Sequence, residues 1–185
     1  MKVKPRDTTP SWRHYDGRIS KIANHWGDRR LVVRLFGLAS RLGDGVFWYV
    51  LMIALLMAGG ERGATAALHM AAVGSVACAL YRYLKRWTRR PRPFHQHLDI
   101  IARIAPLDEF SFPSGHTLHA VSFSAVAIAY LPALAWILVP FTILVAASRV
   151  VLGLHYPSDV LAAGVIGIVL ARASFWLIEI AAVVP

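Results

Sequence analysis

Long apolar runs separated by basic segments dominate the pattern of hydrophobic and polar positions along the chain. A helix needs about 20 mostly apolar residues to cross a bilayer. Residues 63–81 and 160–184 each form such a run, and residues 117–147 carry no formal charge. The stretch at residues 117–147 is long enough for two spans, hinged near residue 131. With one more span near residues 46–58, the pattern predicts an all-α fold, a polytopic transmembrane helix bundle of about five spans.

The first of these spans is the least regular. Residues 46–58 supply thirteen uncharged, mostly apolar positions and reach span length only if the preceding segment contributes. That segment contains Arg41 and Asp44, which lie three residues apart. On a helix this spacing puts both side chains on one face, so we expect them to form an ion pair.

A different pattern precedes the first span. Ile19, Ile22 and Trp26 recur at helical spacing between basic residues. This predicts a single N-terminal amphipathic helix over residues 17–42, which lies in the membrane interface and sets its basic face against anionic lipid headgroups. A bundle helix packed on protein is the alternative. The predicted organisation is a disordered tail at 1–16, the interfacial helix and the entry to the first span at 17–45, and the transmembrane domain at 46–185.

Composition and charge narrow the class of protein. The chain is 57% hydrophobic with a mean hydropathy of +0.52, which is too apolar for an ordinary soluble domain. A net charge of +10 would by itself suggest nucleic-acid binding. However, residues 1–45 hold ten of the 20 Lys and Arg residues, and residues 82–103 hold seven. Basic segments that bracket uncharged runs are typical of membrane proteins, so we expect no nucleic-acid partner.

Three polar segments interrupt the apolar pattern, and each could bind an anion. The first, residues 84–94, concentrates five basic residues within eight positions. The second begins a predicted helix with Ser114 as its N-cap, where the free N–H groups of the first turn point at a bound anion. In the third, Arg149 ends one span, and His155 and Asp159 lie four residues apart at the start of the next.

The predicted hairpin at 117–147 brings these segments together. Two membrane crossings return the chain to the side from which it started, so residues 82–113 and 148–158 face the same side. The planar guanidinium groups of Arg92 and Arg149 can each donate two hydrogen bonds to phosphate oxygens, and Lys85 adds a point charge. Backbone N–H groups at Ser114 and Gly115 would complete an oxyanion cradle.

Two histidines in these segments are candidates for covalent chemistry. Transfer of a phosphoryl group to water in two steps needs a nucleophile and a proton donor. His155 has Asp159 one turn along the chain, and this carboxylate can reach the ring, fix its tautomer and stabilise positive charge on it. We therefore assign the nucleophile to His155. His116, which lacks an adjacent carboxylate in the sequence, is predicted to protonate the leaving oxygen.

The three segments closely resemble the type-2 phosphatidic acid phosphatase family, which shares its pocket with the vanadium haloperoxidases. That family is marked by the motifs K-x6-R-P, P-S-G-H and S-R-x5-H-x3-D, and all eleven fixed positions are present between Lys85 and Asp159. The resemblance implies a helical bundle, a mechanism without metal or cofactor, and a phosphohistidine intermediate on His155. It also implies phosphate binding by five residues: Lys85, Arg92, Ser114, Gly115 and Arg149.

Other polar residues near these motifs have simpler interpretations. His119 lies one turn after His116 and is expected to support the site by packing, and His69 is expected to be neutral and hydrogen-bonded within its span. Asp108 and Glu109 are expected to be solvated or paired with surplus arginines, because a carboxylate facing inward would repel phosphate.

The leading functional hypothesis is an integral-membrane phosphatase that acts on a lipid phosphate or diphosphate, such as phosphatidic acid, phosphatidylglycerol phosphate or a polyprenyl (di)phosphate. A phosphotransferase using the same histidine and a non-catalytic headgroup binder are the alternatives, and the spans argue against a soluble haloperoxidase. We expect a multi-pass protein of a bacterial-type inner membrane. With five spans the basic N-terminus and the catalytic loops share one face, which the positive-inside rule predicts to be cytoplasmic.

Overall fold

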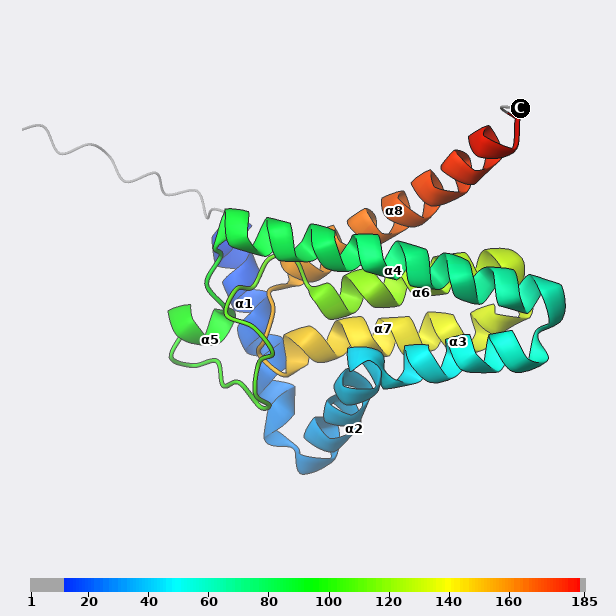
Figure 1. Cartoon of the computed structure of the whole chain (residues 1–185). Helices are drawn as coiled ribbons and strands as arrows, with labels where there is room; N and C mark the ends of the chain where they lie inside the picture. The colour runs from blue at the N-terminus through cyan, green and yellow to red at the C-terminus, as the bar shows by residue number, and fades with distance from the viewer. Residues whose placement is uncertain (1–11, 184–185) are drawn as a thin grey trace, which may run out of the picture.

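The structure, a computed structural model, describes residues 12–183, and all regular elements in that range are helices (Figure 1). The prediction of an all-α fold is therefore confirmed. The helices are α1 (Trp12–His25), α2 (Arg30–Arg41), α3 (Phe47–Ala58), α4 (Gly60–Thr88), α5 (Pro93–Gln96), α6 (Gly115–Tyr130), α7 (Ala135–Val151) and α8 (Pro157–Val183). Short helical turns at Trp26–Asp28, Leu42–Val46 and Pro132–Leu134 join some of them.

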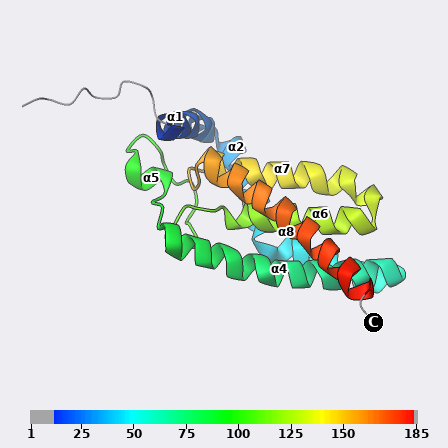
Figure 2. The ribbon, with the colours of Figure 1, turned by 90° about the horizontal axis from the view of Figure 1, so that it is seen from above.

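The transmembrane bundle agrees with the predicted runs. Within the described residues four helical stretches are long and apolar enough to cross a membrane: Arg30–Ala58, Gly60–Gln96, Pro132–Val151 and Pro157–Ala181. The shorter α6 packs against α4, α7 and α8. Figures 1 and 2 show α6 between α4 and α7, with α8 crossing them obliquely. The hinge predicted near residue 131 lies between α6 and α7.

Close approach of α4 and α6 depends on a small residue in α4. A Cβ atom at Gly74 would lie 2.5 Å from the Phe123 ring of α6. That ring belongs to the main apolar core and packs against Trp48 of α3, with ring centroids 5.3 Å apart. Small residues let membrane helices approach closely where no water drives them together. The two helices that carry the first and second motifs are thereby held side by side.

The predicted single helix over residues 17–42 is wrong, because the chain bends between α1 and α2. Arg29 is extended, with φ −87° and ψ 119°. The preceding Gly27 faces the side chain of Arg103, and a Cβ atom there would lie 3.1 Å from Arg103 Nε. The Asn24 side chain donates hydrogen bonds to the backbone oxygens of Ile101 and Val151. These contacts tie the end of α1 to loops distant in the sequence, which a local pattern cannot show.

Helix α1 also starts earlier than predicted, and its polar side faces the protein. It begins at Trp12, inside the segment expected to be disordered, while residues 1–11 lie outside the described residues. The predicted apolar stripe points outward, with Ile19, Ile22 and Trp26 between 51% and 62% exposed. The buried side of the helix is polar and includes Asp16, Ser20 and Asn24.

Candidate active site

The three motif segments meet at one end of the bundle, as the hairpin argument predicted. The end of α4 carries Lys85, the N-terminus of α6 carries Ser114, Gly115 and His116, and the end of α7 carries Arg149. His155 lies in the short connection to α8, whose first turn contains Asp159. Helices α1 and α5 lie at the same end of the molecule (Figure 1).

His155 is buried among cations, with only 1% of the residue exposed. Its Nε2 atom lies 3.3 Å from Nη1 of Arg92, which also donates to the backbone oxygen of Leu154 at 2.7 Å. Burial lowers the pKa of His155 well below its ordinary value, and the charges of Arg149, Arg92, Lys85 and His116 lower it further. The ring is therefore neutral near pH 7, and a nucleophilic imidazole must be neutral to offer a lone pair.

Asp159 does not bond directly to this ring, although the sequence analysis expected its carboxylate to reach His155. The distance from His155 Nδ1 to Asp159 Oδ2 is 3.7 Å, longer than a hydrogen bond, and Nδ1 has no hydrogen-bond partner among the described residues. The carboxylate instead accepts from the Ser111 hydroxyl, from the Tyr156 N–H at 2.9 Å and from Arg90 at 2.6 Å. The two side chains therefore lie close together without a hydrogen bond.

His116 does have a carboxylate partner, Asp44, which the sequence analysis did not connect with this histidine. Its Nε2 atom contacts Asp44, whereas Asp44 was expected to pair with Arg41. The segment Leu42–Val46 is a π-helical turn in which Gly45 has a φ of 141°, so Asp44 does not follow the regular helical spacing. One signal was available: Asp44 is a lone carboxylate between two glycines beside an apolar run, and a charge at membrane depth needs a partner.

Arg149 lies 2% exposed at the end of α7. Its guanidinium donates to the Ser40 hydroxyl of α2, a partner that sequence reasoning missed. The Arg149 Nε–H is buried without a hydrogen-bond partner among the described residues. Since an unpaired buried donor is costly, this geometry suits an anionic oxygen in the pocket.

Asp108 is 40% exposed, as expected of a solvated loop residue, but its carboxylate also contacts two cations of the motifs, which corrects the expected pairing with surplus arginines. Its Oδ1 atom accepts from Lys85 Nζ at 2.8 Å and from Arg92 Nη2 at 2.6 Å. Burial alone would raise the pKa of the Asp108 carboxyl, but the hydrogen bonds and charges of Lys85 and Arg92 outweigh it and hold the pKa below its ordinary value. A cluster of buried cations needs this counter-charge.

The start of α6 has the predicted form. Ser114 is extended, and its side chain accepts from the Thr117 N–H, so it is the N-cap. A Cβ atom at Gly115 would meet the Tyr81 ring at 3.5 Å, an ordinary contact. Packing within the protein therefore does not demand glycine here, and close approach of a ligand to the backbone gives a reason for it.

His119 and His69 have the structural contacts expected of them. The ring nitrogens of His119 lie 3.0 and 3.2 Å from the backbone oxygens of Gly115 and Gly74, between α4 and α6. His69 lies within hydrogen-bond distance of Tyr130 and Ser174. These side chains fix the bundle that carries the motifs.

Comparison with known proteins agrees with this arrangement. The curated undecaprenyl-diphosphatase BcrC of Bacillus subtilis is 28% identical over 130 residues, 70% of this chain and 67% of that protein. A transmembrane PAP2-type phosphatidylglycerolphosphate phosphatase of Bacillus subtilis superimposes with a TM-score of 0.74 and 26% identity, covering 93% of this chain and 88% of that one. LpxE of Aquifex aeolicus also gives a TM-score of 0.74, at 25% identity over 85% and 93% of the two chains.

The sequence profile of one family accounts for most of the chain. It matches residues 46–181, which include all three motifs and every transmembrane helix from α3 onward. The resemblance inferred from the motifs is confirmed, and the chain, a multi-pass membrane phosphatase, belongs to the PAP2 superfamily.

Proposed function

We propose that this protein hydrolyses a lipid phosphate or diphosphate through a phosphohistidine formed on His155, without a metal ion. The observation that carries this proposal is the position of His155 Nε2, which is buried 3.3 Å from a guanidinium nitrogen of Arg92. Such an atom is a neutral nucleophile placed where cations hold a phosphate. Lys85, Arg92, Arg149 and the backbone at Ser114 and Gly115 bind the phosphoryl oxygens.

The reaction then proceeds in two displacements at phosphorus. The lone pair of His155 Nε2 forms the P–N bond as the bond from phosphorus to the leaving oxygen breaks, and His116 gives that oxygen a proton. In the second step His116 takes a proton from water, whose oxygen attacks phosphorus and breaks the P–N bond. Inorganic phosphate leaves, and His155 is neutral again.

The substrate class follows from the membrane setting and from the relatives. The site lies at one end of an apolar bundle, so a lipid can keep its tails in the bilayer while its headgroup enters. One relative is named as an undecaprenyl-diphosphatase and another as a phosphatidylglycerolphosphate phosphatase. We therefore propose a polyprenyl diphosphate, phosphatidylglycerol phosphate or phosphatidic acid as substrate.

Phosphate release in detergent tests this proposal. We expect the wild-type protein to release phosphate from at least one lipid of this panel in the presence of a chelator, and to be inhibited by orthovanadate. His155→Ala should lower kcat at least about a thousandfold, because it removes the nitrogen proposed to form the P–N bond. His25→Ala, at an exposed position, should retain activity. Full activity in His155→Ala would refute the proposed mechanism.

The contact between Asp44 and His116 gives a second test. Asp44 orients the ring and stabilises its protonated form, so Asp44→Asn should lower kcat by roughly a hundredfold with a lipid phosphate, the scale of general acid catalysis. A nitrophenyl phosphate needs little help to leave, and with it the loss should be several-fold smaller. Glu61→Gln, an exposed acid-to-amide change at the far end of α4, is the control. An equal loss on both substrates would contradict a role in protonation.

The position of Asp108 gives a third test of the proposed function. Because its carboxylate holds Lys85 and Arg92, phosphate must displace it to reach both cations. A hydrogen bond to a charged group contributes about 1.5–3 kcal/mol, so Asp108→Asn should lower the inhibition constant for inorganic phosphate roughly tenfold. Phosphate should also raise the unfolding temperature of Asp108→Asn more than that of the wild type.

Glu109 provides the matched control for this experiment. It is the neighbouring acid on the same loop, and it is exposed. Glu109→Gln removes the same formal charge and should leave the phosphate inhibition constant within about twofold of wild type, since screened surface charges contribute little. Weaker phosphate binding in Asp108→Asn than in Glu109→Gln would show that Asp108 does not compete with phosphate.

Membrane orientation is the next part of the proposal. Helix α1, which carries basic residues, packs against the first turn of α8 and so shares the face of the active site. The positive-inside rule then puts both on the cytoplasmic face of a bacterial-type inner membrane. The exposed apolar stripe of α1 would lie among the lipid headgroups, beside anionic lipid.

Cysteine labelling in intact cells tests this orientation. In a Cys78→Ser background, Leu98→Cys places a thiol at a fully exposed position after α5, on the active-site side. We expect a membrane-impermeant maleimide to label it only after lysis. Glu61→Cys, at the opposite end of α4, should be labelled in intact cells. The reverse pattern would place the active site outside the cell.

A further inference from the structure

The catalytic carboxylate Asp159 is held by a side chain that the three motifs do not include. Arg90 Nη1 donates to Asp159 Oδ1 at 2.6 Å, while Ser111 and the Tyr156 N–H occupy Oδ2. Asp159 is fully buried, and the Arg90 side chain is 19% exposed. An arginine so placed fixes the orientation of the carboxylate and also neutralises its charge.

A second carboxylate shares this arginine. Nη2 of Arg90 donates to Asp16 of α1 at 2.6 Å, and the Asp16 side chain is 5% exposed. Asp16 also accepts from Ser158, through its N–H at 3.0 Å and through its hydroxyl. The free N–H groups in the first turn of a helix need such acceptors, so Asp16 joins α1 to the start of α8, one residue from Asp159.

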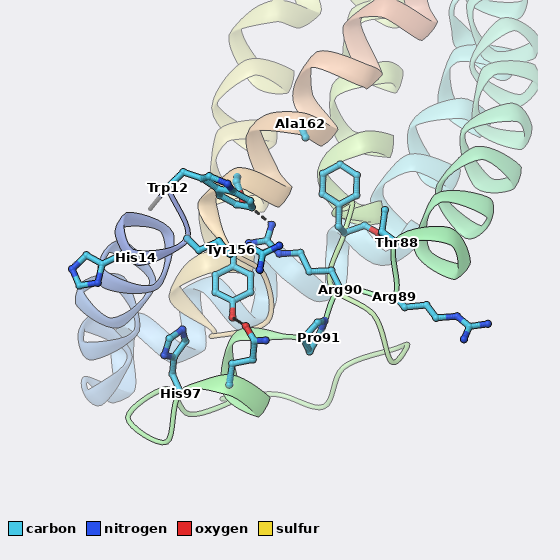
Figure 3. Close-up of a pocket in the computed structure, with 13 residues that line it drawn as sticks. Trp12, His14, Thr88, Arg89, Arg90, Pro91, His97, Tyr156 and Ala162 are labelled. Atoms are coloured by element: carbon cyan, nitrogen blue, oxygen red, sulfur yellow. Dashed lines mark hydrogen bonds between the residues drawn. The ribbon is translucent and has the colours of Figure 1, made fainter. Parts of the chain in front are cut away.

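Two aromatic rings complete the surroundings of Arg90. Its guanidinium carbon lies 4.2 Å from the centroid of Tyr156 and 5.3 Å from that of Trp12. Figure 3 shows Arg90 beside both rings, at the wall of a pocket between α1, the end of α4 and the start of α8. Cation–π contacts with Tyr156 and Trp12 restrain the guanidinium further, so both carboxylates keep the same partner.

We propose that Asp16 is a positioning residue of the active site, which acts on His155 through Arg90 and Asp159. The inference rests on the proposed role of His155 as nucleophile. If Arg90 faced Asp159 alone, the pair would be neutral and would do little for positive charge on the imidazole. With Asp16 included, the group of two carboxylates and one guanidinium carries one net negative charge, and the Asp159 Oδ2 atom of this group lies 3.7 Å from His155 Nδ1. That charge stabilises the ring as the P–N bond forms.

The proposal gives helix α1 a catalytic role that its place in the chain does not suggest. The family profile begins at residue 46, so α1 lies outside the matched region. Its polar side, through Asp16, contacts the catalytic network, while its apolar side is exposed in a form suited to a lipid surface. The helix thereby connects the surface of the bilayer to the buried carboxylate.

Asp16→Asn tests this role in the full-length protein. The substitution keeps the shape of the side chain and removes its charge, so kcat should fall roughly tenfold while KM stays within about twofold of wild type. Asp99→Asn is the control, because Asp99 pairs with Lys21 of α1 at an exposed site and removes a tether of the same helix without touching Arg90. Unchanged kcat in Asp16→Asn, or an equal fall in Asp99→Asn, would overturn the proposal.

A double-mutant cycle separates positioning from loss of structure. If Asp16 acts through Arg90, Arg90→Gln combined with Asp16→Asn should have the kcat of Arg90→Gln alone. Multiplicative losses, or an Asp16→Asn protein whose unfolding temperature falls while its activity per folded molecule is normal, would overturn the proposal. Failure of the proposed function is distinguishable, since it would appear as full activity in His155→Ala.

Discussion

Three buried cations beside a neutral histidine are the constraint on which the rest of this structure depends. Lys85, Arg92 and Arg149 are each at most 5% exposed, at the end of an apolar bundle where ions lose their hydration. They repel one another, and each must find oxygen partners within the protein. Arg92 uses the backbone of Leu154 and Asp108, Lys85 uses Asp108 and the backbone of Phe110, and Arg149 uses Ser40. The loops and helix ends at this face are arranged to supply those oxygens.

The same charges determine how the acids of the site are distributed. A carboxylate directly against the nucleophile would offset the cations that keep His155 neutral and would repel phosphate. Among the described residues no carboxylate is hydrogen-bonded to His155. Asp159 is held by Arg90, Asp44 contacts the second histidine, and Asp108 bridges Lys85 and Arg92. This distribution lets one small site hold three cations, a neutral histidine and a second histidine in contact with a carboxylate.

Sequence reasoning recovered the transmembrane helices and the meeting of the three motifs. Apolar runs of span length are visible in the sequence, and two crossings must return the chain to the same side. What it missed are the partners of the motif residues. Asp44 reaches His116 through a π-helical turn, and Asp108 reaches Lys85 and Arg92 from an irregular loop. Neither orientation follows from residue spacing, since each depends on backbone geometry and on the cations it must neutralise.

Helix α1 shows the same limit in another form. Periodicity identified its apolar stripe but could not say which side packs on the protein, since in water the apolar side would face inward. At a membrane surface the surrounding medium is partly apolar, so the stripe can face outward and the polar side becomes the packed one. Asp16, Ser20 and Asn24 are therefore buried. Asn24 bonds to Ile101 and to Val151 of α7, and Asp16 meets the arginine that holds Asp159. In an interfacial helix, the polar residues on the buried side are thus the ones available to contribute to the active site.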